Sequence, residues 1–169
     1  MRRSLDTLYD AAGYLAAFFL AATLAMVLTG IAGRLFNFHV PGTDSYAGYC
    51  MAASGFLALA HTFKRGEHIR VSLVLEHVGA SARRTLERVS LAIATLLAAL
   101  FAYYSARLAF QSWQFNDVST GNDATPLWLP QLAMAAGTLI LLIAFADELV
   151  LEMRGRRTLH QREEALHSE

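Results

Sequence analysis

Residues 11–33 read AAGYLAAFFLAATLAMVLTGIAG and contain no charged side chain. An α-helix rises about 1.5 Å per residue and the hydrocarbon core of a bilayer is about 30 Å thick, so about 20 apolar residues can cross it. The run exceeds the apolar core of a secretory signal, which is about 7–15 residues long, and Asp6 and Asp10 separate it from Arg2 and Arg3. We therefore interpret this stretch as a retained transmembrane helix.

Three further windows have the length and composition of membrane spans, at about residues 45–63, 89–113 and 127–152. The second window is the weakest, because it is richer in small and weakly polar residues. The chain is 55% hydrophobic and only 17% charged, whereas a soluble domain carries about 25% charged residues. These features predict an all-α integral membrane protein with four transmembrane helices, organised as one domain over residues 1–155 with a polar tail at 156–169.

The positive charges predict the orientation of the spans. All but two of the 14 Lys and Arg residues lie in the N-terminal tail, between the second and third spans, or in the C-terminal tail. The exceptions are Arg34 and Arg107. Loops rich in Lys and Arg stay in the cytoplasm, so both termini are expected there.

The sequence lacks the residues that several classes of function require. The formal net charge is zero, which gives no overall field to attract nucleic acid. The single Cys50 excludes an internal disulfide and a Cys-based zinc site, and no HExxH motif or Gly-rich phosphate loop is present. The middles of the four spans contain no Asp, Glu, Lys or Arg, although carriers usually place ionisable groups there. We expect no catalytic, cofactor-binding or metal-binding residue, and no transport by this chain alone.

The segment between the second and third spans, residues 64–79, reads KRGEHIRVSLVLEHVG. Val71, Val74, Leu75 and Val78 fit one face of a helix, which predicts a short amphipathic elbow on the cytoplasmic membrane surface. Two alternatives stay open: the alternation over residues 68–73 also fits an extended start, and the charges alone fit a plain basic loop.

The order of residues in this elbow resembles a known signature. The small permease subunit of the tripartite ATP-independent periplasmic (TRAP) transporters carries RG(D/E)HIRVD directly after the second of its four membrane helices. The likeness covers residues of about 10–155 and includes TPLWLP at 125–130, similar to the family's entry into its last helix. The chain departs from the pattern at Ser72, where Asp is frequent, and at the second span, which begins with Asp44 but has no Trp. The signature residues here are Arg65, Gly66, Glu67, His68, Ile69, Arg70 and Val71.

This resemblance implies a multi-subunit function in the bacterial inner membrane. A periplasmic substrate-binding protein would deliver an organic anion, such as a carboxylate, to a large membrane subunit of about 12 helices for sodium-coupled uptake. The small subunit would brace the large one and help the binding protein dock. The alternative is a stand-alone four-helix membrane transporter or sensor.

Candidate contact residues follow from the topology and the resemblance. Arg65 and Arg70 are expected to bind lipid headgroups or a partner carboxylate. The expected periplasmic partner contacts are Asp44, Asp117, Asp123 and Trp128.

Other polar and aromatic residues have alternatives that the sequence leaves open. Arg107 either snorkels to the interface or pairs with an acid, and His61 is expected to be a hydrogen-bonded residue rather than a proton relay. Asp147 and Glu148 either face Arg65 or Arg70 or are solvated. The aromatic residues at the periplasmic side are expected to anchor the helices at headgroup level or to contact a partner; they are Tyr46, Tyr49, Trp113 and Trp128.

Overall fold

The computed structural model describes residues 2–38, 40–64 and 80–154. Within these ranges the chain is helical apart from its turns and an isolated β-bridge between Val118 and Pro126, which confirms the all-α prediction. The predicted elbow and the polar tail lie outside the described residues. The helices are α1 (Arg2–Leu35), α2 (Thr43–Lys64), α4 (Ala80–Gln114) and α5 (Trp128–Met153).

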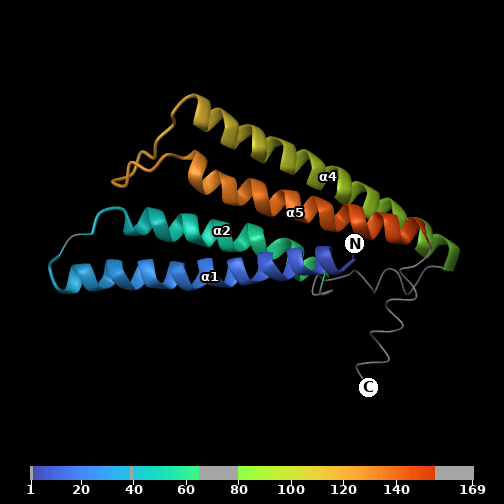
Figure 1. Cartoon of the computed structure of the whole chain (residues 1–169), viewed down its shortest axis with the longest axis horizontal. Helices are drawn as coiled ribbons and strands as arrows, with labels where there is room; N and C mark the ends of the chain where they lie inside the picture. Colours follow the sequence, from blue (N-terminus) through green and yellow to red (C-terminus); the bar gives the residue numbers. More distant parts are fainter. Residues whose placement is uncertain (1, 39, 65–79, 155–169) are drawn as a thin grey trace, which may run out of the picture.

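The four helices form a single row in the order α1, α2, α5, α4 (Figure 1). Helices α1 and α2 make one antiparallel hairpin, α4 and α5 make a second, and the contact between α2 and α5 joins the two. The connections 36–42 and 115–127 lie at the same end of the row, which we call the loop end. The opposite end, where α1 begins and α5 ends, is the terminus end.

Small residues let the helices approach closely. The face of α4 buried against α5 is built mainly of Ala and Ser. In α5, a Cβ added to Gly137 would lie 2.5 Å from the carbonyl oxygen of Phe56 in α2, so the two backbones are in contact. Because lipid tails are as apolar as the side chains, the hydrophobic effect does not bring membrane helices together, and they associate through close packing of this kind. The buried residues of α4 are Leu91, Ala98, Ala102, Ser105, Ala109 and Ser112.

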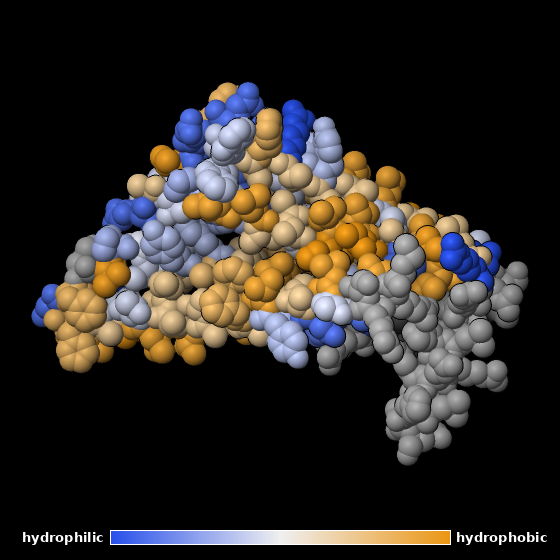
Figure 2. All heavy atoms as spheres, viewed as in Figure 1, coloured by the Kyte–Doolittle hydropathy of each residue, from blue (hydrophilic) through white to orange (hydrophobic). Residues whose placement is uncertain are grey.

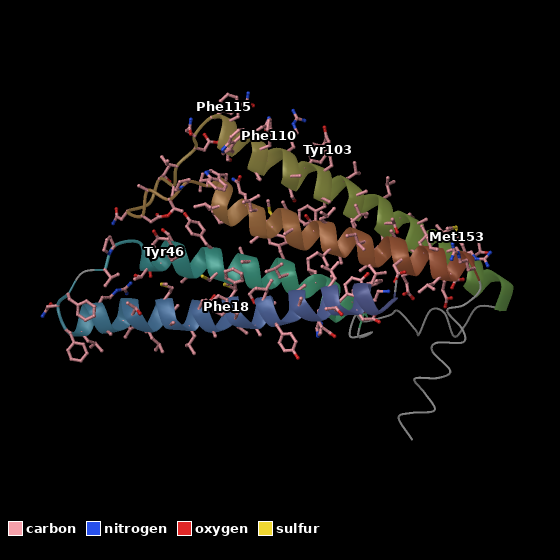
Figure 3. All side chains as sticks on the ribbon, in the orientation of Figure 1. Phe18, Tyr46, Tyr103, Phe110, Phe115 and Met153 are labelled. Atoms are coloured by element: carbon pink, nitrogen blue, oxygen red, sulfur yellow. The ribbon has the colours of Figure 1, made fainter. Side chains whose placement is uncertain are left out.

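A single row of helices leaves most apolar side chains uncovered. In α1 only 6% of the most apolar window is buried, and Phe18 and Leu20 are more than half exposed. Tyr103 and Phe110 project from the outer side of α4 (Figure 3), and hydrophobic residues spread over much of the visible surface (Figure 2). A soluble monomer rarely exposes so large an apolar area, so lipid or a protein partner must cover it.

Within the described residues, three helices are long and apolar enough to cross a membrane: Leu5–Leu35, Thr85–Gln114 and Trp128–Met153. They correspond to the first, third and fourth predicted spans. Helix α2 coincides with the second predicted span but is not among these three, because Gly, Ser, Thr and Tyr interrupt its apolar residues so that it contains no sufficiently apolar window of 18 residues. It lies between α1 and α5, where protein rather than lipid covers two of its sides.

Two helices extend well beyond their predicted spans at the terminus end. Helix α1 begins at Arg2 rather than near residue 11, and α4 begins at Ala80 rather than near residue 89. With 34 residues, α1 is about 50 Å long at 1.5 Å per residue, which exceeds the hydrocarbon thickness. The hydropathy pattern marks only the part of a helix that lipid can cover, so it underestimates both lengths.

Candidate functional site

At the loop end, the carboxylate of Asp123 joins the two hairpins. The Tyr49 hydroxyl of α2 donates to its Oδ2 at 3.1 Å, and the Ser119 hydroxyl donates to its Oδ1 at 2.9 Å. Beside them the hydroxyl oxygens of Thr125 and Tyr46 lie 3.3 Å apart, within hydrogen-bond distance. We call these five residues the loop-end clasp. It fixes the 115–127 connection against the start of α2.

The backbone around the loop-end clasp is adapted to this close contact. Gly42 has a φ of +78°, and a Cβ there would lie 2.6 Å from the Cβ of Asp123, so the position requires glycine. The connection itself is folded back by hydrogen bonds from the Ser119 amide to the Thr125 carbonyl, at 2.8 Å, and from the Leu127 amide to the Asp117 carbonyl, at 2.9 Å.

Hydrogen bonds hold the Asp123 carboxyl in its ionised form. The carboxylate accepts hydrogen bonds from the side chains of Thr125, Ser119 and Ser45, and the bond from Thr125 contributes most. These bonds keep the pKa of Asp123 well below its usual range. A depressed pKa in the folded state stabilises the fold above the usual Asp pKa of about 4, and this contribution is lost as the pH falls through the folded pKa. The loop-end clasp therefore stays charged at neutral pH.

The structure places the four predicted periplasmic contact residues at or near the loop end. Asp44 is exposed and forms an ion pair with Arg34 at 3.4 Å. Asp117 is also exposed, whereas Trp128 is partly buried at the start of α5. Asp123 is engaged within the loop-end clasp. Their contact with a partner stays a prediction.

Tyr46 and Tyr49 have a role that the sequence analysis did not foresee. Both were expected to anchor α2 at the headgroup level or to contact a partner, but their hydroxyls bind the 115–127 connection of the same chain. Tyrosine hydroxyls usually find a hydrogen-bond partner where one is within reach. Here the second hairpin supplies that partner, which the hydropathy pattern of α2 alone cannot reveal.

At the terminus end, Lys64 joins α2 to α5. Its Nζ lies 2.6 Å from Oδ2 of Asp147 and 3.5 Å from Oε2 of Glu148. It also lies 5.4 Å from the centre of the Tyr9 ring in α1, at a distance suited to a cation–π contact. We call these four residues the terminus-end clasp. Their contacts draw three helices together directly before the signature segment 65–71.

The terminus-end clasp changes the interpretation of the two acids of α5. Asp147 and Glu148 were expected to face Arg65 or Arg70 or to be solvated, and the two arginines lie outside the described residues. Their side chains are only 27% and 17% exposed and both lie near the Lys64 ammonium. Because this pairing depends on α2 lying beside α5, it could not be read from the order of residues.

Two further polar contacts reinforce the terminus end. His61 Nδ1 lies 3.2 Å from the Tyr9 carbonyl oxygen and 3.7 Å from Oδ1 of Asp10, which agrees with the expected hydrogen-bonded role. Arg88 of α4 lies 3.5 Å from the buried Glu152 carboxylate of α5. Both hairpins are therefore held internally by polar pairs near the terminus end.

Three further predictions concern Arg107, metal binding and the signature residues. Arg107 is exposed on α4 and forms no ion pair with any residue that the structure describes, which leaves snorkelling and pairing with a partner both open. Among the described residues, no group of three or more His, Cys, Asp or Glu side chains could hold a metal ion. The signature residues 65–71 lie outside the described part of the chain.

Comparison with known proteins identifies the family. No curated protein matches this chain. A family model described as the DctQ component of the tripartite ATP-independent periplasmic transporters matches residues 23–155, which include α2, α4, α5 and both clasps except Tyr9. A family of transporter components is consistent with a chain that is not an enzyme. Because the match covers most of a chain whose described part has three helices long and apolar enough to cross a membrane, this membrane protein belongs to the DctQ family and is the small permease subunit of a TRAP transporter.

Proposed function

We propose that this subunit braces the large membrane subunit of a TRAP transporter in the bacterial inner membrane. It also helps a periplasmic substrate-binding protein to dock, for the sodium-coupled uptake of an organic anion such as a carboxylate. The family match over residues 23–155 is the observation that carries this proposal. The chain has no enzymatic role and moves no substrate itself.

The distribution of polar contacts supports bracing rather than transport. In the described residues, the ion pairs lie toward the ends of the helices, and the loop-end and terminus-end clasps join the hairpins at both ends. An element pinned at both ends resists the sliding and hinge motions that a moving transport domain needs. The arrangement therefore suits a stationary scaffold.

We further propose that α2 crosses the membrane with the other three helices, and that both termini are cytoplasmic. Helix α2 runs antiparallel to α1 along the row (Figure 1), and its lower apolarity is tolerable because α1 and α5 cover two of its sides. On this proposal residues 1–155 form one transmembrane domain, residues 156–169 are a cytoplasmic tail, and the loop end faces the periplasm.

Cysteine labelling can count the spans, because three and four spans place the second loop on opposite sides. In a Cys50→Ala background, we expect a membrane-impermeant maleimide to label Val40→Cys and Thr120→Cys in intact spheroplasts. It should label Thr158→Cys only after lysis. If α2 stays outside the membrane, Thr120→Cys is protected until lysis, and that result would refute four spans.

One face of α2 is suited to hold the large subunit. Gly48, Met51, Ala52 and Gly55 lie on this helix and are exposed, and a Cβ added to either glycine meets no atom within 4 Å. Exposed small residues on the helix that is not among the three candidate spans are poorly suited to lipid, but they allow another helix to pack closely. We propose that this α2 face contacts the large subunit.

A bulky residue on the α2 face tests this contact. Gly55→Leu should leave the thermal stability of the isolated chain unchanged or slightly higher, because leucine favours helix over glycine by almost 1 kcal/mol. The same variant should recover much less of the large subunit when the two are co-expressed and the small subunit is purified by a tag. Leu96→Ala, at an exposed position on α4, is the control. Equal recovery with wild type and Gly55→Leu would exclude the α2 face as the contact.

The signature residues Arg65 to Val71 are assigned to contacts with lipid headgroups or with the partner subunit. The terminus-end clasp supports this role, since Lys64 fixes the chain to α5 at the residue directly before the signature. Phosphate and carboxylate groups both pair well with Arg65 and Arg70.

A further inference from the structure

A polar pocket of about 430 Å³ lies at the loop end, where α1 ends and α2 begins. Its volume falls in the usual range for small-ligand sites, about 300–1,000 Å³. Asn122 of the 115–127 connection contributes to the lining, so both hairpins build the pocket. Nothing in the proposed function assigns a ligand to it.

The pocket contains one positive and one negative side chain. Arg34 comes from the last turn of α1 and Asp44 from the first turn of α2. Their side chains are 76% and 86% exposed and lie 3.4 Å apart, so their mutual pairing is weak and easily opened. The other polar residues of the lining are neutral hydroxyl and amide groups, supplied by Thr29, Asn37, Thr43, Ser45 and Asn122.

This charge pattern complements a zwitterion. A phosphate can accept hydrogen bonds from the planar Arg34 guanidinium, while an ammonium group can donate to the Asp44 carboxylate. An anionic ligand would satisfy Arg34 but bring a second negative charge to Asp44. A simple cation would pair with Asp44 but bring a second positive charge to Arg34.

The surroundings of the pocket match the boundary of a membrane. The span of α1 ends at Leu35, and the residues that follow it include exposed aromatic and aliphatic side chains, typical of the headgroup region. In the last turns of α1, the side chains of Val27, Leu28 and Ile31 are exposed, and acyl chains can lie against them. The exposed apolar residues at this boundary are Phe38 and Val40, which belong to the lining of the pocket, and Leu35 and Phe36, which lie close to it in the sequence.

We propose that this pocket binds the zwitterionic headgroup of phosphatidylethanolamine, with Arg34 holding the phosphate, Asp44 holding the ammonium group, and the acyl chains lying along α1. The proposal depends on the membrane placement of α1 and not on the bracing role. A bound lipid would bridge α1, α2 and the 115–127 connection at the loop end.

Native mass spectrometry of the full-length chain, released from detergent micelles, tests this site. We expect the wild type to retain one phosphatidylethanolamine in preference to phosphatidylglycerol with the same acyl chains. In Arg34→Gln and Asp44→Asn the retention of phosphatidylethanolamine should fall at least about tenfold, because each loses a charge-assisted contact. Arg107→Gln removes an exposed arginine from a different helix and should retain the lipid like wild type.

Three results would overturn the proposal. One is equal retention of phosphatidylglycerol and phosphatidylethanolamine by the wild type, a comparison that needs no folded variant. Another is unchanged retention in both pocket variants. The third is binding of free phosphoethanolamine as tight as that of the lipid, which would assign the pocket to a soluble molecule.

Discussion

Replacing Gly137 with leucine is expected to abolish the folded row of helices. Even a single added carbon would lie 2.5 Å from the carbonyl oxygen and 2.6 Å from the carbonyl carbon of Phe56. Overpacking a core costs about 1–3 kcal/mol where side chains can shift, but here the obstacle is the backbone of α2. We expect a loss above about 3 kcal/mol, a large share of the 5–15 kcal/mol that stabilises a typical domain.

Size-exclusion chromatography of a fluorescently tagged chain, before and after heating, measures this effect. Gly137→Leu should elute as aggregate or disappear, whereas Gly55→Leu is the matched control, since an added Cβ there meets no atom within 4 Å. A Gly137→Leu variant that elutes and melts like wild type would show that α2 and α5 are not in backbone contact.

Replacing Lys64 with methionine should produce the second large effect, a destabilisation of about 2 kcal/mol. Breaking a fully buried ion pair costs about 3–5 kcal/mol and an exposed one at most about 1 kcal/mol. The terminus-end clasp lies between these limits, because the side chains of Lys64, Asp147 and Glu148 are 17–27% exposed. Methionine preserves much of the aliphatic stem, so the lost charge dominates the change.

A double-mutant cycle separates this pair from general damage to α2. Asp147→Asn in the Lys64→Met background should restore part of the melting temperature, since it removes the carboxylate that has lost its nearest ammonium. The control is Arg34→Met, which breaks an ion pair whose side chains are 76% and 86% exposed and should change stability by less than about 1 kcal/mol. Additive effects of the Lys64 and Asp147 substitutions would contradict a direct interaction.

The sequence was most informative about the individual helices. Apolar length predicted all four, and the positions of α2 and α5 were correct to within a few residues. The ends of α1 and α4 at the terminus end were underestimated, because a helix can continue into water as a polar segment. The composition marked the second span as the weakest of the four, and α2 is the helix that is not apolar enough to count as a span by itself. That α1 and α5 flank this helix could not be read from the sequence.

Contacts between the hairpins were beyond the reach of a single sequence. Lys64 and Asp147 are separated by 83 positions, and Tyr49 and Asp123 by 74, with no local pattern linking either pair. Asp123 was expected to contact a periplasmic partner, which stays a prediction, whereas its hydrogen bonds with Tyr49 and Ser119 were not foreseen. In contrast, the signature RGEHIRV indicated the family correctly, because it depends on the order of residues rather than on their packing.

The close approach at Gly137 was not predicted from the sequence, although Ala133 and Gly137 have the four-residue spacing of small residues that permits it. Gly48, Ala52 and Gly55 have the spacing that often marks a helix interface, yet the α2 face they form is open in this chain. Gly137, the only glycine of α5, makes the tightest contact. Spacing shows where a helix can be approached closely, but it does not show by which neighbour.

Reconstituted uptake tests most directly the claim that this chain braces a transporter without transporting. The large membrane subunit is placed in proteoliposomes with and without this chain, with its substrate-binding protein and labelled substrate outside and a sodium gradient directed inward. The account predicts sodium-dependent uptake only when both membrane subunits are present, and none above empty vesicles with this chain alone. Full uptake by the large subunit without this chain, or uptake by this chain alone, would contradict it.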